Sequence, residues 1–368
     1  MKEYIFSKLV GSQIMRIRPY QPGRPLEEVK REFGLKKVIK LASNENPLGP
    51  SAKAIQAVRD CASQIYFYPD GAGRELKEAL AQKLSLNSEN IILGNGSDEI
   101  VSMITRVFLR QGDKAIMATP SFLMYEMGAN LSQARIVSVP LKHFKIDLER
   151  MIRAVGPKTR VVFIANPNNP TGTIVKGEEV DRFVSRLPEN ILVVFDEAYY
   201  EYVEAEDFPQ SLDLARNHPN IIVLRTFSKI YGLAGLRIGY GVAGKEIIDI
   251  LNRARSPFNV NFLAQVAALA SLTDQEQVKR SRQLIRGEKK FLYAHLRKLE
   301  IFFVPTEANF ILIEVGKKAK EVEYRLLEKG VIVRGMQVYD LPQFIRVSIG
   351  TREQNKEFIG ELQTILSS

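Results

Sequence analysis

The chain has 368 residues, 45% hydrophobic and 26% charged, a composition typical of a soluble globular protein with more than one domain. Its 52 lysines and arginines outnumber its 42 aspartates and glutamates, and the resulting charge of +10 suits nucleic-acid binding or the attraction of small anionic substrates. Because Cys61 is the single cysteine, an intrachain disulfide is excluded. The sequence also shows no secretory signal pattern and no apolar run of membrane-spanning length, so we expect a cytoplasmic protein.

The N-terminal segment contains the stretch "RPYQPGRP", whose three prolines are incompatible with a continuous helix. We therefore predict an extended arm over residues 1–45.

Six short apolar runs alternate with helical patterns between about residues 90 and 245. They are "KAIMAT", "ARIVSV", "RVVFIANP", "ILVVFDEAY", "NIIVLRTF" and "RIGYGV". Near-continuous apolar strands separated by helices predict an α/β large domain over residues 46–260, with a mostly parallel sheet covered by helices. Ligands of such sheets bind at the carboxyl ends of the strands.

The pattern changes after residue 260. A helical stretch from Phe262 to about Leu299 precedes four apolar runs and a helix over 318–329, which predicts a smaller α+β domain over residues 261–368. The most basic stretch, 279–298, has apolar residues at helical spacing. We interpret it as the solvated face of an amphipathic helix rather than as a nucleic-acid surface.

The segment "ILGNGSDEIV" joins a strand to a helix through glycines. Gly96, Ser97 and Asp98 stand where the helix begins, and exposed N–H groups at a helix N-terminus bind anions. The alternative is that Ser97 or Asp98 only caps the helix.

Two further polar groups follow apolar strands. Asn169 lies in "NPNNPTG", which is a bare turn or a source of an amide donor to a ligand. Asp196 follows "VVF", where a carboxylate is costly unless it is paired. It serves either as a cap or salt-bridge partner or as the counter-ion of a cationic ring nitrogen.

Lys229 lies in "RTFSKIYGLAGLRIGY", directly after an apolar run. Burial among apolar groups and other cations favours the neutral amine, which is a nucleophile for aldehydes and forms a Schiff base. Thr226, Ser228 and Arg237 are then candidate anchors for an anionic group. Taken alone, Lys229 is more simply interpreted as a lysine whose ammonium reaches the surface. Together, the four segments match the functional groups of one cofactor.

These motifs resemble those of the pyridoxal-phosphate aminotransferases of fold type I. The matching segments are "SDE", "NPNNPTG", "DEAY", "TFSK" with "GLAGLRIG", and "RVSIG". The segments "RPYQPGRP", "LASNENPLGP", "YPDG", "GNGSDE", "RSPFNVN" and "FIRVSIGTREQN" further resemble the histidinol-phosphate aminotransferase branch, from about residue 20 to the C-terminus. The resemblance implies the fold of that family, pyridoxal 5′-phosphate as cofactor and a place in histidine biosynthesis.

The resemblance also implies roles for individual residues. Lys229 would hold the cofactor aldehyde and move a proton, Asp196 would pair with the ring nitrogen, and Asn169 and Tyr199 would bind the ring hydroxyl. Phe122 would stack on the ring. The cofactor phosphate would be held by Gly96, Ser97, Thr226, Ser228 and Arg237, with Asp98 in the same segment. Tyr68 of "YPDG" would reach this phosphate from the second subunit of a homodimer. Outside this context, Phe122 and Tyr68 are ordinary core aromatics.

For the substrate, Arg346 matches the arginine that binds a carboxylate, and Arg334 and Tyr20 match groups that reach a phosphate, with Asn44 nearby. Arg334 is alternatively a surface residue after an edge strand. The implied reaction converts L-histidinol phosphate and 2-oxoglutarate to imidazole acetol phosphate and L-glutamate.

Three other functions remain open at this stage. They are an aromatic amino-acid aminotransferase, a pyridoxal-phosphate decarboxylase of a phosphorylated amino acid, and a basic nucleic-acid-binding or scaffold protein. We expect no nucleic-acid or membrane partner. Because the three histidines are dispersed, we also expect no metal site.

Overall fold

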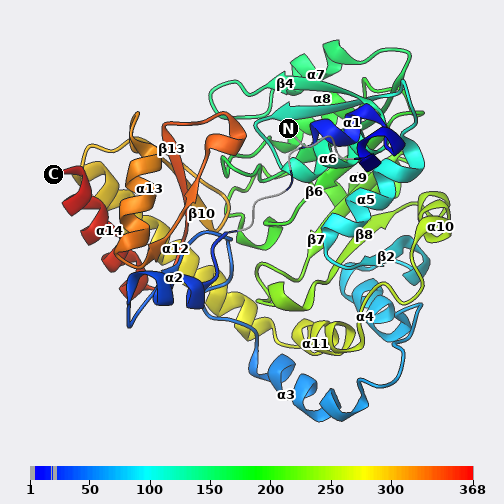
Figure 1. Cartoon of the computed structure of the whole chain (residues 1–368). Helices are drawn as coiled ribbons and strands as arrows, with labels where there is room; N and C mark the ends of the chain where they lie inside the picture. The colour runs from blue at the N-terminus through cyan, green and yellow to red at the C-terminus, as the bar shows by residue number, and fades with distance from the viewer. Residues whose placement is uncertain (1–4, 18, 20–22, 368) are drawn as a thin grey trace.

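The computed structural model describes residues 5–17, 19 and 23–367. Two bodies are visible in Figure 1: a large one built on a wide sheet, and a smaller one that contains the C-terminal helix α14 (Arg352–Leu366). The strands of the wide sheet are coloured from light blue to green in the figure, and the smaller body is mostly orange and red.

The wide sheet has seven strands in the order β2-β8-β7-β6-β5-β3-β4. All neighbours are parallel except β8, which runs antiparallel to both β2 and β7. The strands are β2 (Ile91–Gly94), β3 (Lys114–Thr119), β4 (Arg135–Pro140), β5 (Thr159–Ala165), β6 (Leu192–Asp196), β7 (Ile221–Thr226) and β8 (Gly239–Ala243). The expected mostly parallel sheet of an α/β protein is confirmed.

Alternate side chains of the central strands enter two separate hydrophobic clusters, one on each face. Val161 and Phe163 of β5 belong to one cluster, whereas Val162 and Ile164 belong to the other. The first face is covered by α5 (Ser97–Phe108), α6 (Leu123–Leu131) and α10 (Lys245–Ala254), and the second by α7 (Leu148–Ala154), α8 (Gly177–Val184) and α9 (Ser211–Asn217). Both faces are dry, which explains why these strands are apolar throughout rather than alternating.

The smaller body is built on a four-stranded antiparallel sheet in the order β12-β13-β10-β9. Its strands are β9 (Phe303–Val304), β10 (Phe310–Glu314), β12 (Arg334–Gly335) and β13 (Phe344–Ser348). Helices α13 (Ala319–Glu328) and α14 pack against each other beside it.

The N-terminal segment differs from a simple extended arm. It contains α1 (Ser12–Arg16), α2 (Leu26–Phe33) and β1 (Ile39–Lys40), and β1 pairs in parallel with β11 (Val331–Ile332). Val29 of α2 shares a hydrophobic cluster with Ile332, so α2 is part of the smaller body's core, whereas α1 contacts α6 of the large body. The prolines did exclude a continuous helix, but a short helix lies on each side of the proline-containing stretch.

The helix expected from Phe262 to about Leu299 is two helices, α11 (Phe262–Leu272) and α12 (Gln275–Lys298). Asp274 interrupts it by capping α12, since its side chain accepts a hydrogen bond from the N–H of Gln277. Helix α11 packs on α3 (Ala52–Cys61) and α4 (Arg74–Leu84), at the lower end of Figure 1. We therefore propose a domain boundary near Asp274 rather than at residue 261.

Candidate active site

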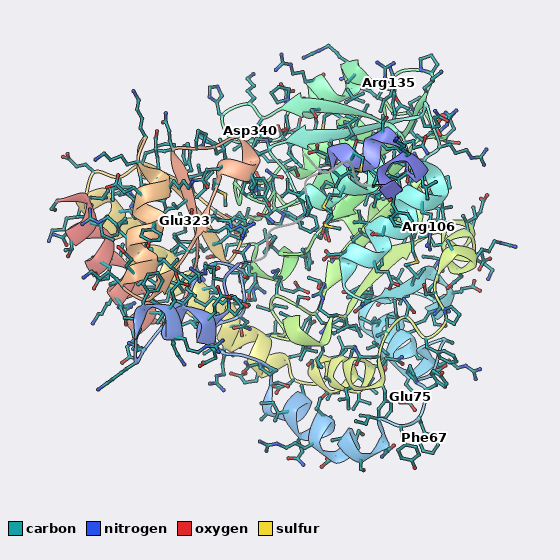
Figure 2. The ribbon with its side chains drawn as sticks, viewed as in Figure 1. Phe67, Glu75, Arg106, Arg135, Glu323 and Asp340 are labelled. Carbon is teal, nitrogen blue, oxygen red and sulfur yellow. The ribbon has the colours of Figure 1, made fainter. Side chains whose placement is uncertain are left out.

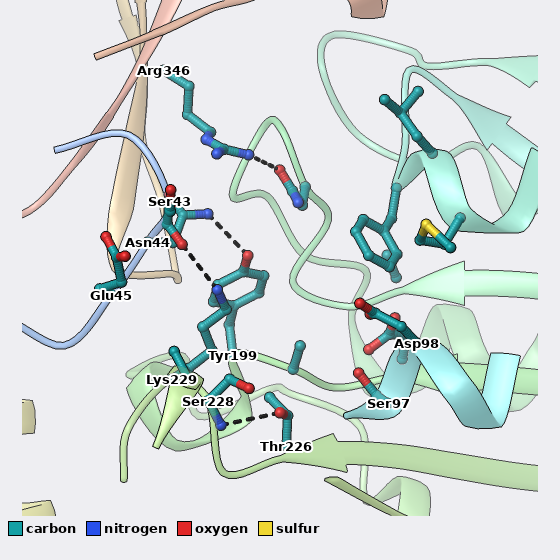
Figure 3. A pocket seen from close by; sticks show the side chains of 18 of the residues that line it. Ser43, Asn44, Glu45, Ser97, Asp98, Tyr199, Thr226, Ser228, Lys229 and Arg346 are labelled. Atoms are coloured by element: carbon teal, nitrogen blue, oxygen red, sulfur yellow. Dashed lines mark hydrogen bonds between the residues drawn. The ribbon is translucent and has the colours of Figure 1, made fainter. Parts of the chain in front are cut away.

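A pocket of about 280 Å³ lies at the carboxyl ends of β5, β6 and β7, where the two bodies meet. In Figure 3, Ser97 and Asp98 of α5 stand on one side of it and Arg346 of β13 on the other, with Lys229 and Tyr199 between. The pocket brings together most of the residues expected from the sequence. They are Asn44, Ser97, Asp98, Phe122, Asn169, Asp196, Tyr199, Thr226, Ser228, Lys229, Arg237, Arg334 and Arg346.

Lys229 follows β7 and directs its amine into this pocket rather than to the surface. Its Nζ donates a hydrogen bond to the carbonyl oxygen of Ser43, at 3.1 Å, and lies 5.7 Å from the centre of the Tyr199 ring. Burial, and secondly the positive charge of Arg346, lower the pKa of Lys229 to about 8. Roughly one fifth of this amine is therefore neutral near physiological pH, far more than for an ordinary lysine.

Asp196, the last residue of β6, is buried and carries two oxygens in different situations. Oδ2 accepts a hydrogen bond of 2.7 Å from the hydroxyl of Tyr125. Oδ1 is buried and has no hydrogen-bond partner among the described residues. Burial is the main reason why the pKa of Asp196 rises to about 6. An unpaired buried oxygen of this kind is suited to a cationic N–H donor.

Tyr199 is fixed by a chain of hydrogen bonds from the N-terminal segment. Its hydroxyl accepts from Nδ2 of Asn44 at 2.9 Å, and Oδ1 of Asn44 accepts from the Ser348 hydroxyl at 3.1 Å. Asn44 has a positive φ of 56° and is almost completely buried. Burial raises the pKa of Tyr199 to about 12, so its hydroxyl keeps its proton at ordinary pH.

The N-terminus of α5 and the end of β7 form a cradle for an anion. Gly96 precedes α5 with φ of 78°, and a Cβ at this position would lie 2.5 Å from Nη2 of Arg237. Arg237 also donates to the Ser228 hydroxyl at 3.4 Å and pairs with Oδ2 of Asp98 at 3.3 Å. The N-cap is Gly96, so Ser97 and Asp98 lie inside the helix and do not cap it. Together the helix dipole, the hydroxyls and the guanidinium suit a phosphate.

The pocket wall opposite α5 carries the substrate candidates. Arg346 is buried and donates to Oδ1 of Asn169 at 2.5 Å and to the carbonyl oxygen of Ala42 at 2.9 Å. Arg334 of β12 lines the same pocket. It stands directly opposite Arg346 in the register of the antiparallel strands β12 and β13. Phe122 borders the pocket on the α6 side, edge-on to Tyr125 with ring centres 5.5 Å apart.

Two of the expected residues are not in the pocket, and a third cannot be placed. Gly96 lies beside the pocket, next to Ser97. Tyr68 is 80% exposed and stacks on Phe258, with ring centres 4.7 Å apart. Its neighbour Phe67 lies at the outer lower end of the molecule in Figure 2, near Glu75 of α4. Tyr20 falls outside the described residues.

Several lining residues were not predicted from the sequence, and two of them contact predicted site residues. Tyr125 was missed although it stands three residues after Phe122, one helical turn further, which was a usable signal. The carbonyl of Ser43 was also missed, and no sequence pattern marks it, because any residue supplies a backbone oxygen.

The described residues give no sign of a metal site, since no three His, Cys, Asp or Glu side chains are grouped to hold an ion. None of the helices in the described part of the chain combines the length and the apolar character that crossing a membrane requires.

Residues 36–362 match the family model described as aminotransferase class I and II. The chain is 52% identical over 355 residues to the histidinol-phosphate aminotransferase of Moorella thermoacetica, covering 96% of this chain and 92% of that protein. It is 46% identical to the enzyme of the same name from Caldicellulosiruptor saccharolyticus, covering 96% and 99%.

Among solved structures, the chain resembles the histidinol-phosphate aminotransferase of Sinorhizobium meliloti in complex with pyridoxal-5′-phosphate. The TM-score is 0.90 at 28% identity, with 97% of each chain covered. The resemblance expected from the sequence motifs is thus confirmed.

Proposed function

The chain belongs to the class I and II aminotransferase family, and from this membership we propose that it transfers the amino group of L-histidinol phosphate to 2-oxoglutarate. The products are imidazole acetol phosphate and L-glutamate, and the reaction belongs to histidine biosynthesis. The observation that carries the proposal is the partly neutral amine of Lys229 in one pocket with the unpaired Oδ1 of Asp196.

The cofactor is pyridoxal 5′-phosphate, and the residues of the pocket fit it. Lys229 supplies an amine for the aldehyde, and Oδ1 of Asp196 lacks the partner that a protonated ring nitrogen provides. The cradle of Gly96, Ser97 and Arg237 suits the phosphate. When bound, this cofactor accepts the electrons of the bond that breaks at the substrate carbon.

The chain's own residues then have separable tasks. With the cofactor bound, Nζ of Lys229 would take the proton from the substrate carbon and deliver it to the cofactor carbon that carried the aldehyde. Its pKa of about 8 suits a group that accepts and donates a proton near neutral pH. Asp196 would keep a proton on the ring nitrogen. Asn169 and Tyr199 would orient the ring by donating hydrogen bonds to its hydroxyl oxygen, and Phe122 would pack against the ring face.

The two arginines on the smaller body supply the substrate site. Arg346 presents a buried guanidinium, whose planar donor pair matches a carboxylate such as that of 2-oxoglutarate. Arg334 lines the same pocket and would meet a second anionic group, the phosphate of one substrate or the second carboxylate of the other. One pocket thereby serves both substrates.

We also propose that two copies form a homodimer in which Tyr68 reaches the cofactor phosphate of the partner. Tyr68 does not line its own chain's pocket and belongs to an exposed aromatic surface, which is typical of a protein contact. That surface consists of Ile65, Tyr66, Phe67, Tyr68 and Phe258.

The single cysteine, which allows no intrachain disulfide, supports a cytoplasmic location.

A half-reaction panel tests the proposed substrate. Protein loaded with the cofactor is mixed separately with L-histidinol phosphate, phenylalanine, tyrosine and glutamate, and conversion to the aminated cofactor is followed by absorbance. We expect histidinol phosphate and glutamate to react fastest. If phenylalanine reacts as fast as histidinol phosphate, the aminotransferase is an aromatic one instead. Release of carbon dioxide would overturn the proposal in favour of a decarboxylase.

A further inference from the structure

Tyr125 is a buried tyrosine that lines the pocket, and its hydroxyl donates a hydrogen bond to Oδ2 of Asp196. It lies in the first turn of α6, with no exposed surface. Its ring is stacked on Phe163 of β5, with ring centres 4.7 Å apart and an angle of 9° between the planes. The ring therefore has a fixed position against the central sheet.

The helix that carries Tyr125 is itself held closely. A Cβ at Gly128 would lie 2.7 Å from Oγ1 of Thr105, so α6 approaches α5 more closely than any larger residue would permit. Burial raises the pKa of Tyr125 far above its ordinary value. The hydroxyl consequently keeps its proton and acts as a permanent donor to Oδ2 of Asp196.

We propose that Tyr125 is a positioning residue for the cofactor: its hydroxyl holds Oδ2 of Asp196, leaves Oδ1 for the ring nitrogen, and keeps the carboxylate too weak a base to remove the proton from that nitrogen. This inference rests on the proposed function, because it concerns the same cofactor. It assigns to Tyr125 a task that Lys229, Asn169 and Tyr199 do not perform.

The direction of the effect follows from the charges around Asp196. Burial raises the pKa of Asp196 most, and the negative charges of Asp98 of α5 and of Glu197, the next residue in the chain, raise it further. The Tyr125 hydrogen bond acts against them, because donation to the charged form of a carboxyl lowers its pKa. Loss of this donor leaves Asp196 more basic, and the shared proton moves from the ring nitrogen towards the carboxylate.

The test replaces Tyr125 by phenylalanine, which keeps the ring and removes the donor. In the protein without cofactor, the pKa of Asp196, followed by carbon-13 NMR of labelled aspartate, is expected to rise by about one unit. In the loaded protein, the visible absorbance changes with pH and its midpoint reports the proton on Lys229 Nζ. We expect this midpoint to rise, because a neutral ring withdraws fewer electrons from that nitrogen than a protonated ring does. The dissociation constant of the cofactor is expected to increase about tenfold.

Tyr293→Phe is the matched control. Its hydroxyl accepts one hydrogen bond, from the N–H of Thr306 at 2.8 Å, and it does not line the active-site pocket. A second variant, with 3-fluorotyrosine incorporated at position 125, has a more acidic hydroxyl and is a stronger donor. It should lower both the pKa of Asp196 and the absorbance midpoint, the reverse of Tyr125→Phe.

The proposal is overturned if Tyr125→Phe leaves the pKa of Asp196 and the absorbance midpoint unchanged, or if Tyr293→Phe shifts them equally. Opposite shifts in the two position-125 variants support it. A wild-type protein that takes up no pyridoxal 5′-phosphate would instead contradict the proposed function. The NMR titration of Asp196 would then still decide whether Tyr125 controls the carboxylate.

Discussion

Arg346 and Asn169 join the two bodies of the molecule inside the active-site pocket. Nη1 of Arg346, on β13 of the four-stranded sheet, donates to Oδ1 of Asn169, in the loop after β5 of the wide sheet, at 2.5 Å. Nη2 of the same guanidinium donates to the carbonyl of Ala42. The arginine is thus oriented by two other parts of the chain before any substrate arrives, which reduces the ordering that binding must impose.

Arg346→Lys should weaken substrate binding strongly. A lysine ammonium cannot satisfy Asn169, Ala42 and a carboxylate with the planar geometry of a guanidinium. We expect KM for 2-oxoglutarate to rise about 10- to 100-fold, the cost of losing one charge-assisted hydrogen bond. Arg352→Lys, at an arginine that pairs with Glu288 outside the pocket, is the control. Equal KM values in the two variants would rule out a substrate role for Arg346.

Lys229 should react with the cofactor in a pH-dependent way set by its own amine. The neutral form is the nucleophile, so the rate of cofactor uptake by the empty protein should rise with pH and reach half its maximum near pH 8. A half-maximum near the ordinary lysine pKa of 10.5 would contradict the buried, cation-flanked setting. The measurement is stopped-flow absorbance across a pH series.

Lys229→Ala should abolish turnover and remove the site of covalent attachment. After soaking with pyridoxal 5′-phosphate and reduction by borohydride, the wild-type peptide that contains Lys229 should carry the label, as read by mass spectrometry. Lys53→Ala, which removes an amine bonded to the carbonyl of Thr273 outside the pocket, should keep both label and activity. Retained turnover in Lys229→Ala would remove the proposed catalytic role.

Tyr68 should act across a dimer interface, and mixed dimers can detect this. Tyr68→Ala and Lys229→Ala should each be poorly active when pure. A mixed dimer has one site that combines the intact Lys229 of one copy with the intact Tyr68 of the other. Refolding the two variants together should therefore restore activity, measured by the half-reaction. No recovery in dimers verified by sedimentation would show that Tyr68 does not serve the partner's site.

Arg225 and Glu197 form a buried ion pair behind the pocket, and its disruption should destabilise the fold. Nη2 of Arg225 lies 2.8 Å from Oε2 of Glu197, and the glutamate side chain is fully buried. Arg225→Met leaves this charge unpaired and should lower the free energy of unfolding by about 3–5 kcal/mol. Arg186→Ala, which breaks the exposed pair with Glu149, should change it by less than about 1 kcal/mol. Urea denaturation compares the two.

The wide sheet was predictable because its strands are buried on both faces. Such strands can be predicted from local sequence alone, because they are continuous apolar runs such as "VVFIA". The polar residues that follow each run indicate the edge of the sheet where ligands bind. Asp196 and Lys229 were identified on this basis, and both line the pocket. The break at Asp274 and the short helices of the N-terminal segment were missed. One capping side chain interrupts a periodic pattern, and the prolines exclude a helix only where they stand, not on either side of them.

The sequence by itself determined the chemistry of the pocket, since the amine, the carboxylate and the arginines are properties of residue types at strand ends. Only the tertiary structure decided how those groups are held. Asn44 meets Tyr199, Tyr125 meets Asp196 and Arg346 meets Asn169 across separations of 155, 71 and 177 residues. Hydrogen bonds depend on distance and direction in space, and these are set by the packing of the sheets and helices rather than by proximity along the chain.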